Sequence, residues 1–248
     1  MPAYNASKTL SSVLNRIPGD VWTAVKTVWV INDGSTDNTA AEIEKAAAQY
    51  PKIRGVTLPE NRGYGGAVKQ ALAKADAEAV DIAVCLHADG QYAPERIPTL
   101  LTALQARHLD LLQGSRIASG TALSGGMPVY KYVAGRALTA LENIVFRMKM
   151  TDYHSGYMVY GKKALETIPF ESLTNGFDFD LEVIATARSL GLSIGEEPVP
   201  TRYGDEISHL SPIPYGFRVL GVLRKYLSGH YGRIARAEAA RRRSERGA

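Results

Sequence analysis

Residues 82–91, Ile82-Ala83-Val84-Cys85-Leu86-His87-Ala88-Asp89-Gly90-Gln91, join an apolar run to a short polar turn. Such a run, bounded by polar residues, is typical of a strand that is buried on both faces of a parallel sheet. The expected strands are 27–31, 53–58, 80–86 and 109–113, and the helical patterns between them span 36–50, 66–76 and 94–107. This alternation predicts an α/β fold, in which helices flank a mostly parallel sheet.

The second half of the chain continues the alternation after a glycine-rich stretch. Residues 118–128 have no clear period and predict a loop. After this loop the expected elements are a helix over 130–149, a strand over 156–160, a helix over 178–190 and a strand over 194–199. Neither an internal repeat nor an interdomain linker is evident, so we expect one domain over 1–211, followed by a basic helix and tail over 212–248.

Composition excludes several classes of protein. The chain has 248 residues, 45% of them apolar, which is enough for a sizeable core. Cys85 is the single cysteine, which excludes an internal disulfide and a cysteine-rich zinc site and fits a reducing compartment. No run reaches the roughly 18 apolar residues of a membrane span, and no leader pattern opens the chain, so we expect a cytoplasmic protein.

Charge is distributed unevenly along the chain. Residues 216–248 contain nine Lys or Arg and two Glu, whereas the formal net charge of the whole chain is +4. The remainder is therefore slightly acidic, and we expect no nucleic-acid partner.

Two strand ends carry polar side chains suited to a nucleotide. In open α/β sheets, ligands bind beyond the carboxyl ends of the strands. After the strand over 27–31, Asp33 can accept hydrogen bonds from a base or a ribose, and Gly34 permits a tight turn. After the strand over 80–86, Asp89 and Gln91 offer oxygen ligands for Mg²⁺ or Mn²⁺ bound to a diphosphate. Each segment alone is also compatible with a turn and a helix cap, but their joint occurrence favours a binding site.

Five ordered segments resemble the motifs of family 2 glycosyltransferases, with the greatest similarity to the dolichol- or polyprenyl-phosphate mannosyl- and glucosyltransferase branch. They are Pro2-Ala3-Tyr4-Asn5, Asn32-Asp33-Gly34-Ser35-Thr36-Asp37, Asn61-Arg62-Gly63-Tyr64-Gly65-Gly66-Ala67, Ala88-Asp89-Gly90-Gln91 and Gly114-Ser115-Arg116. The resemblance covers residues 1 to about 210 and implies a GT-A, Rossmann-like fold, an inverting reaction and a divalent metal. It implies nucleotide-sugar contacts from Pro2, Ala3, Tyr4, Asn5, Asp33, Gly65, Ala88 and Asp89.

The resemblance extends into the second half of the chain. It implies a catalytic role for Arg116, and it implies that Arg202, with His209, closes over the donor diphosphate. Lys131 and Arg136 supply further cations that could grip an acceptor phosphate. For Lys131 a solvated helix position remains an alternative. The segment 152–157 resembles the family's segment near the acceptor site, and 176–182 resembles the start of the helix that follows it. The segment 198–209 resembles the family's late Arg-containing loop, with His209 in place of Lys.

The chemistry depends on the acceptor. A lipid phosphate is already an anionic nucleophile, so alignment and electrostatic stabilisation suffice. A saccharide hydroxyl requires a general base, for which Asp178, Asp180 and Asp152 are candidates, although Asp178 can equally cap a helix. We favour the lipid phosphate because the second-half motifs resemble that branch. A binding protein without turnover, and less readily a nucleotidyltransferase, are the other classes considered.

The chain departs from the family pattern in two features. Relatives have a strand before Pro-x-Tyr-Asn, so we expect the first strand to be missing here. Relatives commonly have Asp where this chain has His87, and a neutral imidazole there could bind a metal with a preference for Mn²⁺, or only pack at the strand end.

The segment Tyr215–Leu227 has an apolar stripe interrupted by cations. This pattern suits a helix on an anionic membrane surface, here the inner face, and equally a packing helix with a solvated basic end. We expect disorder at Arg241-Arg242-Arg243.

Overall fold

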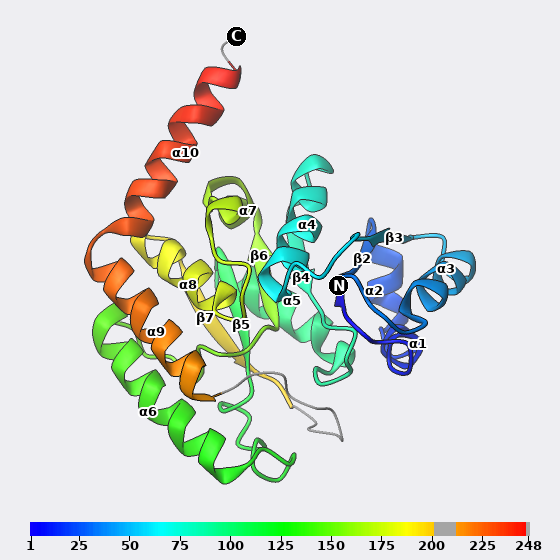
Figure 1. Cartoon of the computed structure of the whole chain (residues 1–248), viewed down its shortest axis with the longest axis horizontal. Helices are drawn as coiled ribbons and strands as arrows, with labels where there is room; N and C mark the ends of the chain where they lie inside the picture. Colours follow the sequence, from blue (N-terminus) through cyan, green and yellow to red (C-terminus); the bar gives the residue numbers. More distant parts are fainter. Residues whose placement is uncertain (201–211, 247–248) are drawn as a thin grey trace.

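The computed structural model of the chain describes residues 1–200 and 212–246. Its strands form two neighbouring sheets covered by helices (Figure 1). The strands are β1 Pro2–Ala3, β2 Val28–Asn32, β3 Ile53–Thr57, β4 Ile82–Cys85, β5 Leu111–Ser115, β6 Met158–Gly161 and β7 Ile194–Pro198. The helices are α1 Leu10–Asn15, α2 Gly19–Ala24, α3 Thr39–Gln49, α4 Tyr64–Ala77, α5 Ile97–Ala106, α6 Val129–Phe146, α7 Lys162–Thr167, α8 Phe179–Ser189, α9 Pro212–Leu227 and α10 His230–Arg246, with 3₁₀ turns at Pro94–Arg96 and Phe170–Ser172.

The first sheet has the order β1-β2-β3 and is parallel throughout. The Pro2–Asn5 motif itself begins with a strand, β1, which is two residues long and pairs with Ile31 and Asn32 of β2. On its other side, the Pro2 carbonyl accepts a 3.2 Å hydrogen bond from the Ala88 amide, just beyond β4. The β1 strand therefore connects the two sheets.

The second sheet has the order β4-β6-β5-β7. Strand β6 is antiparallel to both β4 and β5, whereas β5 and β7 are parallel. The α/β fold and a predominance of parallel pairs are as predicted. The antiparallel strand was not predicted, because an apolar run does not encode its own direction.

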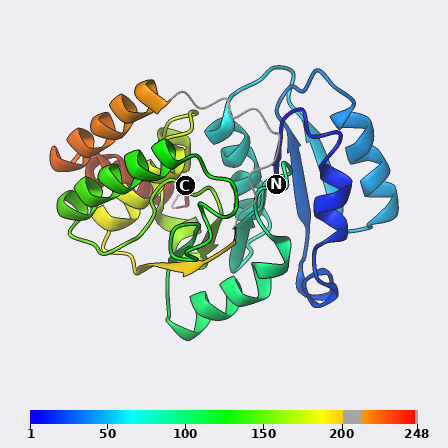
Figure 2. The ribbon, with the colours of Figure 1, turned by 90° about the horizontal axis from the view of Figure 1, so that it is seen from below.

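Two large apolar clusters hold the helices against the sheets. One lies between the first-half helices and the sheets, and it includes Leu10, Leu14 and Ile53. The other lies under α4, α6, α8 and α9, and it includes Phe146 and Phe179. Figure 2 shows the result, with the sheet of β1–β3 at one end of the molecule and α6 and α9 at the other.

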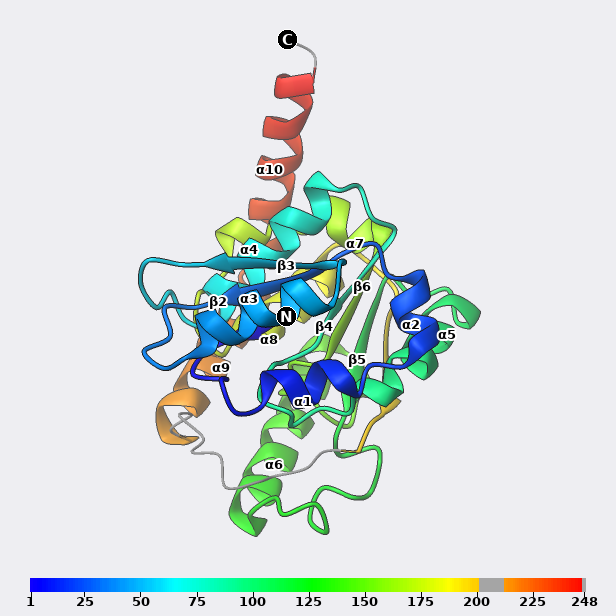
Figure 3. The same ribbon diagram turned by 90° about the vertical axis from the view of Figure 1, so that its right-hand side faces the viewer.

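The C-terminal region differs from expectation. The expected disorder at Arg241–Arg243 is wrong, because these residues continue α10, which projects from the body (Figure 3). Glu238 supports this turn, since its Oε1 lies 2.8 Å from Arg241 Nη2 and 2.9 Å from Arg242 Nε. Within residues 1–200 and 212–246, every helix is too short or too polar to cross a bilayer.

Candidate active site

The carboxyl ends of β2 and β4 lie on either side of β1. Asp33 is the residue directly after β2, and Asp89 follows β4 by four residues. The β1 strand bonds to β2 on one side and to Ala88 on the other. The fold therefore gathers three of the predicted motifs at one edge of the sheets.

Asp33 joins the end of β2 to the segment that precedes α4. Its buried carboxylate accepts a 2.7 Å hydrogen bond from the Arg62 amide, and burial raises the pKa of Asp33. Gly34 has φ +64°, and a Cβ atom there would lie 2.5 Å from the Asn61 nitrogen. Only glycine fits this turn, because the backbone of residues 60–61 passes directly against it.

The Tyr4–Asn5 segment is fixed to the same turn. The Asn5 amide donates to Ser35 Oγ and its side-chain oxygen accepts from the Thr36 amide, both at 3.0 Å. The Tyr4 ring is exposed and is available to a planar ligand.

Asp89 presents its carboxylate at the end of β4. Its Oδ1 accepts a 3.0 Å hydrogen bond from the Gln91 amide, and its Oδ2 lies 3.8 Å from His87 Nδ1. Burial acts to raise the pKa of Asp89, but the neighbouring His87 outweighs it and holds this pKa below the usual value. The Asp89 side chain is 39% exposed, so an ionised carboxylate is accessible here.

This donor set fits a metal that is shared with a diphosphate. Among the described residues, no three His, Cys, Asp or Glu side chains cluster to hold a metal by themselves. Mg²⁺ and Mn²⁺ commonly take one or two protein carboxylates and complete their coordination with substrate phosphates and water. Asp89, with Gln91 in the same turn, is therefore compatible with such an ion.

His87 belongs to a buried polar chain. Its Nε2 lies 3.2 Å from the Tyr64 hydroxyl, which donates a 2.7 Å hydrogen bond to Asp180 Oδ2. Burial acts to lower the pKa of His87, but the adjacent Asp89 raises it well above the usual value. Burial raises the pKa of Asp180 to about 6. Tyr64 lies in the motif 61–67, but its contact with Asp180 was not predicted, because the two residues are 116 positions apart.

Gly65 lies where the start of α4 contacts the backbone of Thr174 and Asn175. Its amide donates a 2.9 Å hydrogen bond to the Asn175 carbonyl, and a Cβ atom would lie 2.6 Å from the Thr174 carbonyl oxygen. It therefore packs the start of α4 against the segment that leads into α8.

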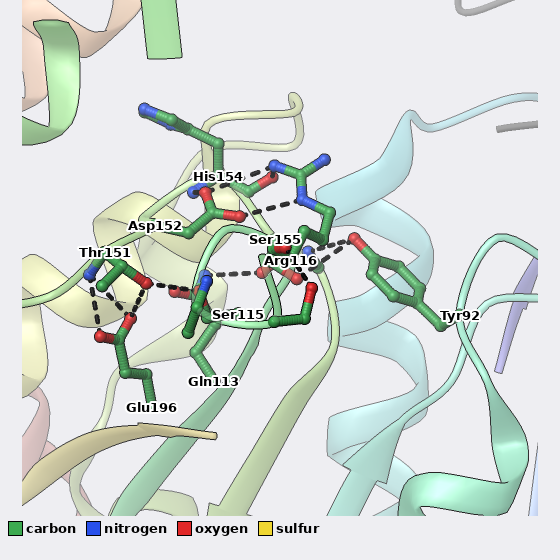
Figure 4. Close-up of polar contacts among 12 residues, drawn as sticks. Tyr92, Gln113, Ser115, Arg116, Thr151, Asp152, His154, Ser155 and Glu196 are labelled. Atoms are coloured by element: carbon green, nitrogen blue, oxygen red, sulfur yellow. Dashed lines mark hydrogen bonds and ion pairs between the residues drawn. The ribbon is translucent and has the colours of Figure 1, made fainter. Parts of the chain in front are cut away.

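Arg116 follows β5 and is held by the loop before β6 (Figure 4). Its Nε lies 2.9 Å from Asp152 Oδ2, and its Nη2 donates a 2.8 Å hydrogen bond to the His154 carbonyl. Burial acts to raise the pKa of Asp152, but the Arg116 guanidinium lowers it below its usual range. The Arg116 side chain therefore has a fixed orientation at this corner.

A second buried pair supports the same loop. His154 Nε2 lies 3.4 Å from the fully buried Glu142 of α6, and its Nδ1 lies 3.0 Å from the Tyr215 hydroxyl of α9. Sequence reasoning missed Glu142 and Tyr215, which only the packing of α6 and α9 brings to His154.

The remaining predicted residues lie apart or outside the described part of the chain. Asp178 precedes α8 without a side-chain capping bond, and its Oδ1 lies 3.2 Å from Arg218 Nη1 of α9. Lys131 is half-buried and Arg136 exposed on α6. Arg202 and His209 lie outside the described residues.

A protein-family model and several relatives match this chain. The glycosyl transferase family 2 model matches residues 1–169. A UDP-N-acetylglucosamine–dolichyl-phosphate N-acetylglucosaminyltransferase of Methanococcus voltae is 27% identical over 232 residues, covering 88% of this chain and 91% of the relative. An undecaprenyl-phosphate mannosyltransferase of Micrococcus luteus is 28% identical over 200 residues, covering 80% of each.

A solved structure shares the fold. Glucosyl-3-phosphoglycerate synthase from Mycobacterium tuberculosis, in complex with UDP, aligns with a TM-score of 0.65 and 23% identity, covering 92% of this chain and 77% of that one. The same enzyme with Mn²⁺ and UDP-glucose aligns with a TM-score of 0.63. The family match spans more than half of the chain, and the chain therefore belongs to glycosyl transferase family 2.

Proposed function

We propose that this glycosyltransferase moves a sugar, with inversion, from a nucleoside diphosphate to a polyprenyl or dolichyl phosphate. The observation that carries the proposal is the position of Asp33 and Asp89 at two strand ends on either side of β1. A nucleotide at one end and its diphosphate at the other would span this edge.

The donor would lie along the first sheet edge. In this proposal Pro2, Ala3 and the exposed Tyr4 contact the base, while Asn5 and Asp33 fix the turns around the ribose. Ala88 and Asp89 border the diphosphate, and Gly65 keeps α4 close to it. UDP in the structural neighbour supports a UDP-sugar, with a GDP-sugar as the competing donor.

A divalent cation would sit at Asp89, with Gln91 and His87 beside it. When bound, Mg²⁺ or Mn²⁺ supplies positive charge that stabilises the departing diphosphate. Mn²⁺ accompanies UDP-glucose in the structural neighbour, which supports this assignment.

The reaction would need little proton transfer from the protein. An acceptor phosphate oxygen attacks the anomeric carbon, the bond from that carbon to the donor phosphate oxygen breaks, and the electron pair stays on the leaving nucleoside diphosphate. Arg116, fixed by Asp152, would stabilise charge on these phosphates without reorganising. Arg202 is proposed for the same task from the family resemblance.

The candidate bases favour a phosphate acceptor over a hydroxyl. Asp152 is paired with Arg116 and Asp178 with Arg218, so neither is poised to take a proton. Asp180 is buried behind Tyr64. Asp178 therefore acts, in this proposal, by holding α9 near the site. The relatives of Methanococcus voltae and Micrococcus luteus carry lipid-phosphate acceptors in their names, which supports the same choice.

The test is sugar transfer from a panel of UDP- and GDP-hexoses to a polyprenyl phosphate, with Mg²⁺, Mn²⁺ or a chelator. We expect transfer with one donor class, loss of transfer with the chelator, and loss in Asp89→Ala. The matched control is Asp81→Ala, because this exposed carboxylate lies away from the site and pairs only with exposed Lys162 among the described residues. Donor binding without transfer to any phosphate or hydroxyl acceptor would instead identify a binding protein.

A further inference from the structure

His154 contacts the charged corner of the site through its backbone and two helices through its side chain. The His154 carbonyl accepts a 2.8 Å hydrogen bond from Arg116 Nη2, and its amide donates a 2.8 Å hydrogen bond to Asp152 Oδ1. The imidazole points away from Arg116 (Figure 4). The position of this ring therefore affects the carbonyl that holds Arg116.

Helices α6 and α9 each contact one nitrogen of the His154 ring. Nε2 lies 3.4 Å from Glu142 Oε2 of α6, and Nδ1 lies 3.0 Å from the Tyr215 hydroxyl of α9. The imidazole and the Tyr215 ring also pack edge to face, with centroids 5.4 Å apart. The His154 side chain is 12% exposed, so water has little access to these contacts. The two helices therefore fix the direction of the ring together.

Glu142 is an unusual residue for the buried side of a helix. Its side chain is fully buried, and neither carboxyl oxygen has a hydrogen-bond partner among the described residues. Burial of a carboxylate without hydrogen bonds costs stability, whereas an apolar side chain of similar size would avoid that cost. His154 is the one group that pairs with Glu142 in the part of the chain that the structure describes. Orientation of His154 therefore explains this carboxylate better than stability does.

Other contacts attach the preceding residues to α6 without the His154 ring. Asn143 donates a 2.8 Å hydrogen bond to the Met150 carbonyl and accepts a 2.9 Å bond from the Met150 amide. The Tyr153 hydroxyl donates a further 2.9 Å bond to the Asn143 side-chain oxygen. The segment 150–153 can therefore stay in place when the ring contacts of His154 are removed. The change should be confined to the end of this segment, where the His154 carbonyl lies.

We propose that His154 is a positioning residue for Arg116. Glu142 and Tyr215 act through its ring, so that the His154 carbonyl keeps the guanidinium oriented to stabilise phosphate charge during transfer. The task of Arg116 in transfer rests on the proposed function. Its orientation can be measured without transfer, so the two can fail separately.

The first test is nuclear magnetic resonance of the full chain, which detects the N–H group at Arg116 Nε. A guanidinium N–H held in an ion pair exchanges slowly with water and gives a resolved signal. Arg116→Lys removes this signal and so identifies it. The ring contacts are removed one at a time, by Tyr215→Phe on the α9 side and by Glu142→Leu on the α6 side. We refer to these two as the ring-contact variants.

Two controls separate positioning from a general loss of packing. Tyr231→Phe also removes a hydroxyl of a C-terminal helix from a buried partner, because Tyr231 donates a 2.9 Å hydrogen bond to Glu182 Oε1. Glu142→Gln keeps a polar group of the same size beside Nε2. We expect the Arg116 signal to shift or broaden in both ring-contact variants. It should remain as in the wild type in Tyr231→Phe and Glu142→Gln.

The second test combines the steady-state kinetics of transfer with thermal denaturation. Both ring-contact variants should lower kcat about tenfold to a hundredfold, rather than raise the donor KM, because Arg116 is misplaced in the transition state. Glu142→Leu should be as stable as the wild type or more stable, because a buried carboxylate is removed. Tyr231→Phe should lower stability, because Glu182 loses a hydrogen bond, yet keep the wild-type kcat. A residue that only supports the fold cannot produce this opposite pattern.

The positioning role is overturned if the Arg116 signal is absent from the wild type, or is the same in the wild type and the ring-contact variants. It is also overturned if kcat falls in proportion to stability across the variants, or stays at the wild-type value when the signal changes. The expected signal pattern in a chain that transfers sugar to no acceptor overturns the proposed function and leaves the positioning role intact.

Discussion

Tyr64 and Asp180 are joined by a 2.7 Å hydrogen bond in which the phenol hydroxyl donates to Oδ2. The same hydroxyl lies 3.2 Å from His87 Nε2, so the bond links α4, the start of α8 and the turn after β4. The other carboxyl oxygen of Asp180 is buried without a hydrogen-bond partner. Tyr64 is therefore the single hydrogen-bond partner of this carboxyl group in the described part of the chain.

Replacing Tyr64 with Phe should lower the free energy of unfolding by about 1–3 kcal/mol, because a buried carboxyl group loses its partner. Urea denaturation of Tyr64→Phe measures this change. Tyr4→Phe removes a hydroxyl from an exposed ring and should change stability by less than about 0.5 kcal/mol. Equal effects in the two variants would contradict a structural role for the Tyr64–Asp180 bond.

Stability should depend on pH through Asp180. Its folded pKa of about 6 lies above the ordinary value of 3.8, so the folded state binds more protons than the unfolded state between these values. This contribution is therefore greatest at low pH and is lost as pH rises from about 4 to about 6, by on the order of 3 kcal/mol. Denaturation of the wild type and Asp180→Asn across this range measures the difference. A difference that is constant with pH would show that Asp180 does not titrate there.

Removing the Arg116 side chain should leave Asp152 as an unpaired buried charge. Arg116→Ala should lower the free energy of unfolding by about 3–5 kcal/mol at neutral pH. Arg116→Ala combined with Asp152→Asn should be less destabilised than Arg116→Ala alone, because the uncompensated charge is gone. Chemical denaturation of the single and double variants measures this coupling. Simple additivity of the two changes would rule it out.

Gly34 and Gly191 form a matched pair for testing the turn after β2. Both have positive φ, at +64° and +70°, but only Gly34 lies against backbone, since nothing is within 4 Å of a Cβ atom at Gly191. Gly191→Ala should cost about 1–2 kcal/mol for its left-handed backbone alone. Gly34→Ala should cost more and weaken UDP binding, because residues 60–61 must move and Asp33 holds the adjacent Arg62 amide. Thermal denaturation and UDP titration compare the two, and equal stability losses with unchanged binding would remove the steric argument.

The sequence predicted much of the fold because apolar runs are local signals. The six predicted strands are present with ends within two residues of expectation. Helices α1, α2 and α7 were missed, since six residues carry little periodicity. The direction of β6 and the role of β1 as a connection between sheets depend on distant pairing, which no local pattern encodes.

The candidate site was predictable to a similar extent. Asp33 and Asp89 follow apolar runs, so their place at strand ends could be read directly. The buried polar contacts behind the site could not be predicted, because Tyr64 meets Asp180, and Glu142 meets His154, only through the packing of helices. The exposure of apolar side chains such as Val133 and Ile144 on α6 was also missed, because apolar residues at helical spacing normally indicate a buried face.

The antiparallel strand β6 also constrains the order in which the chain can fold. It lies between β4 and β5 in the second sheet, yet it follows both of them along the chain. During synthesis, the sheet of β1–β3 can form early from contacts within the first 57 residues. The edges of β4 and β5 that pair with β6 stay unpaired until residues 158–161 have left the ribosome. The nascent chain thus passes through a stage with two unpaired strand edges, which are prone to pair with other chains.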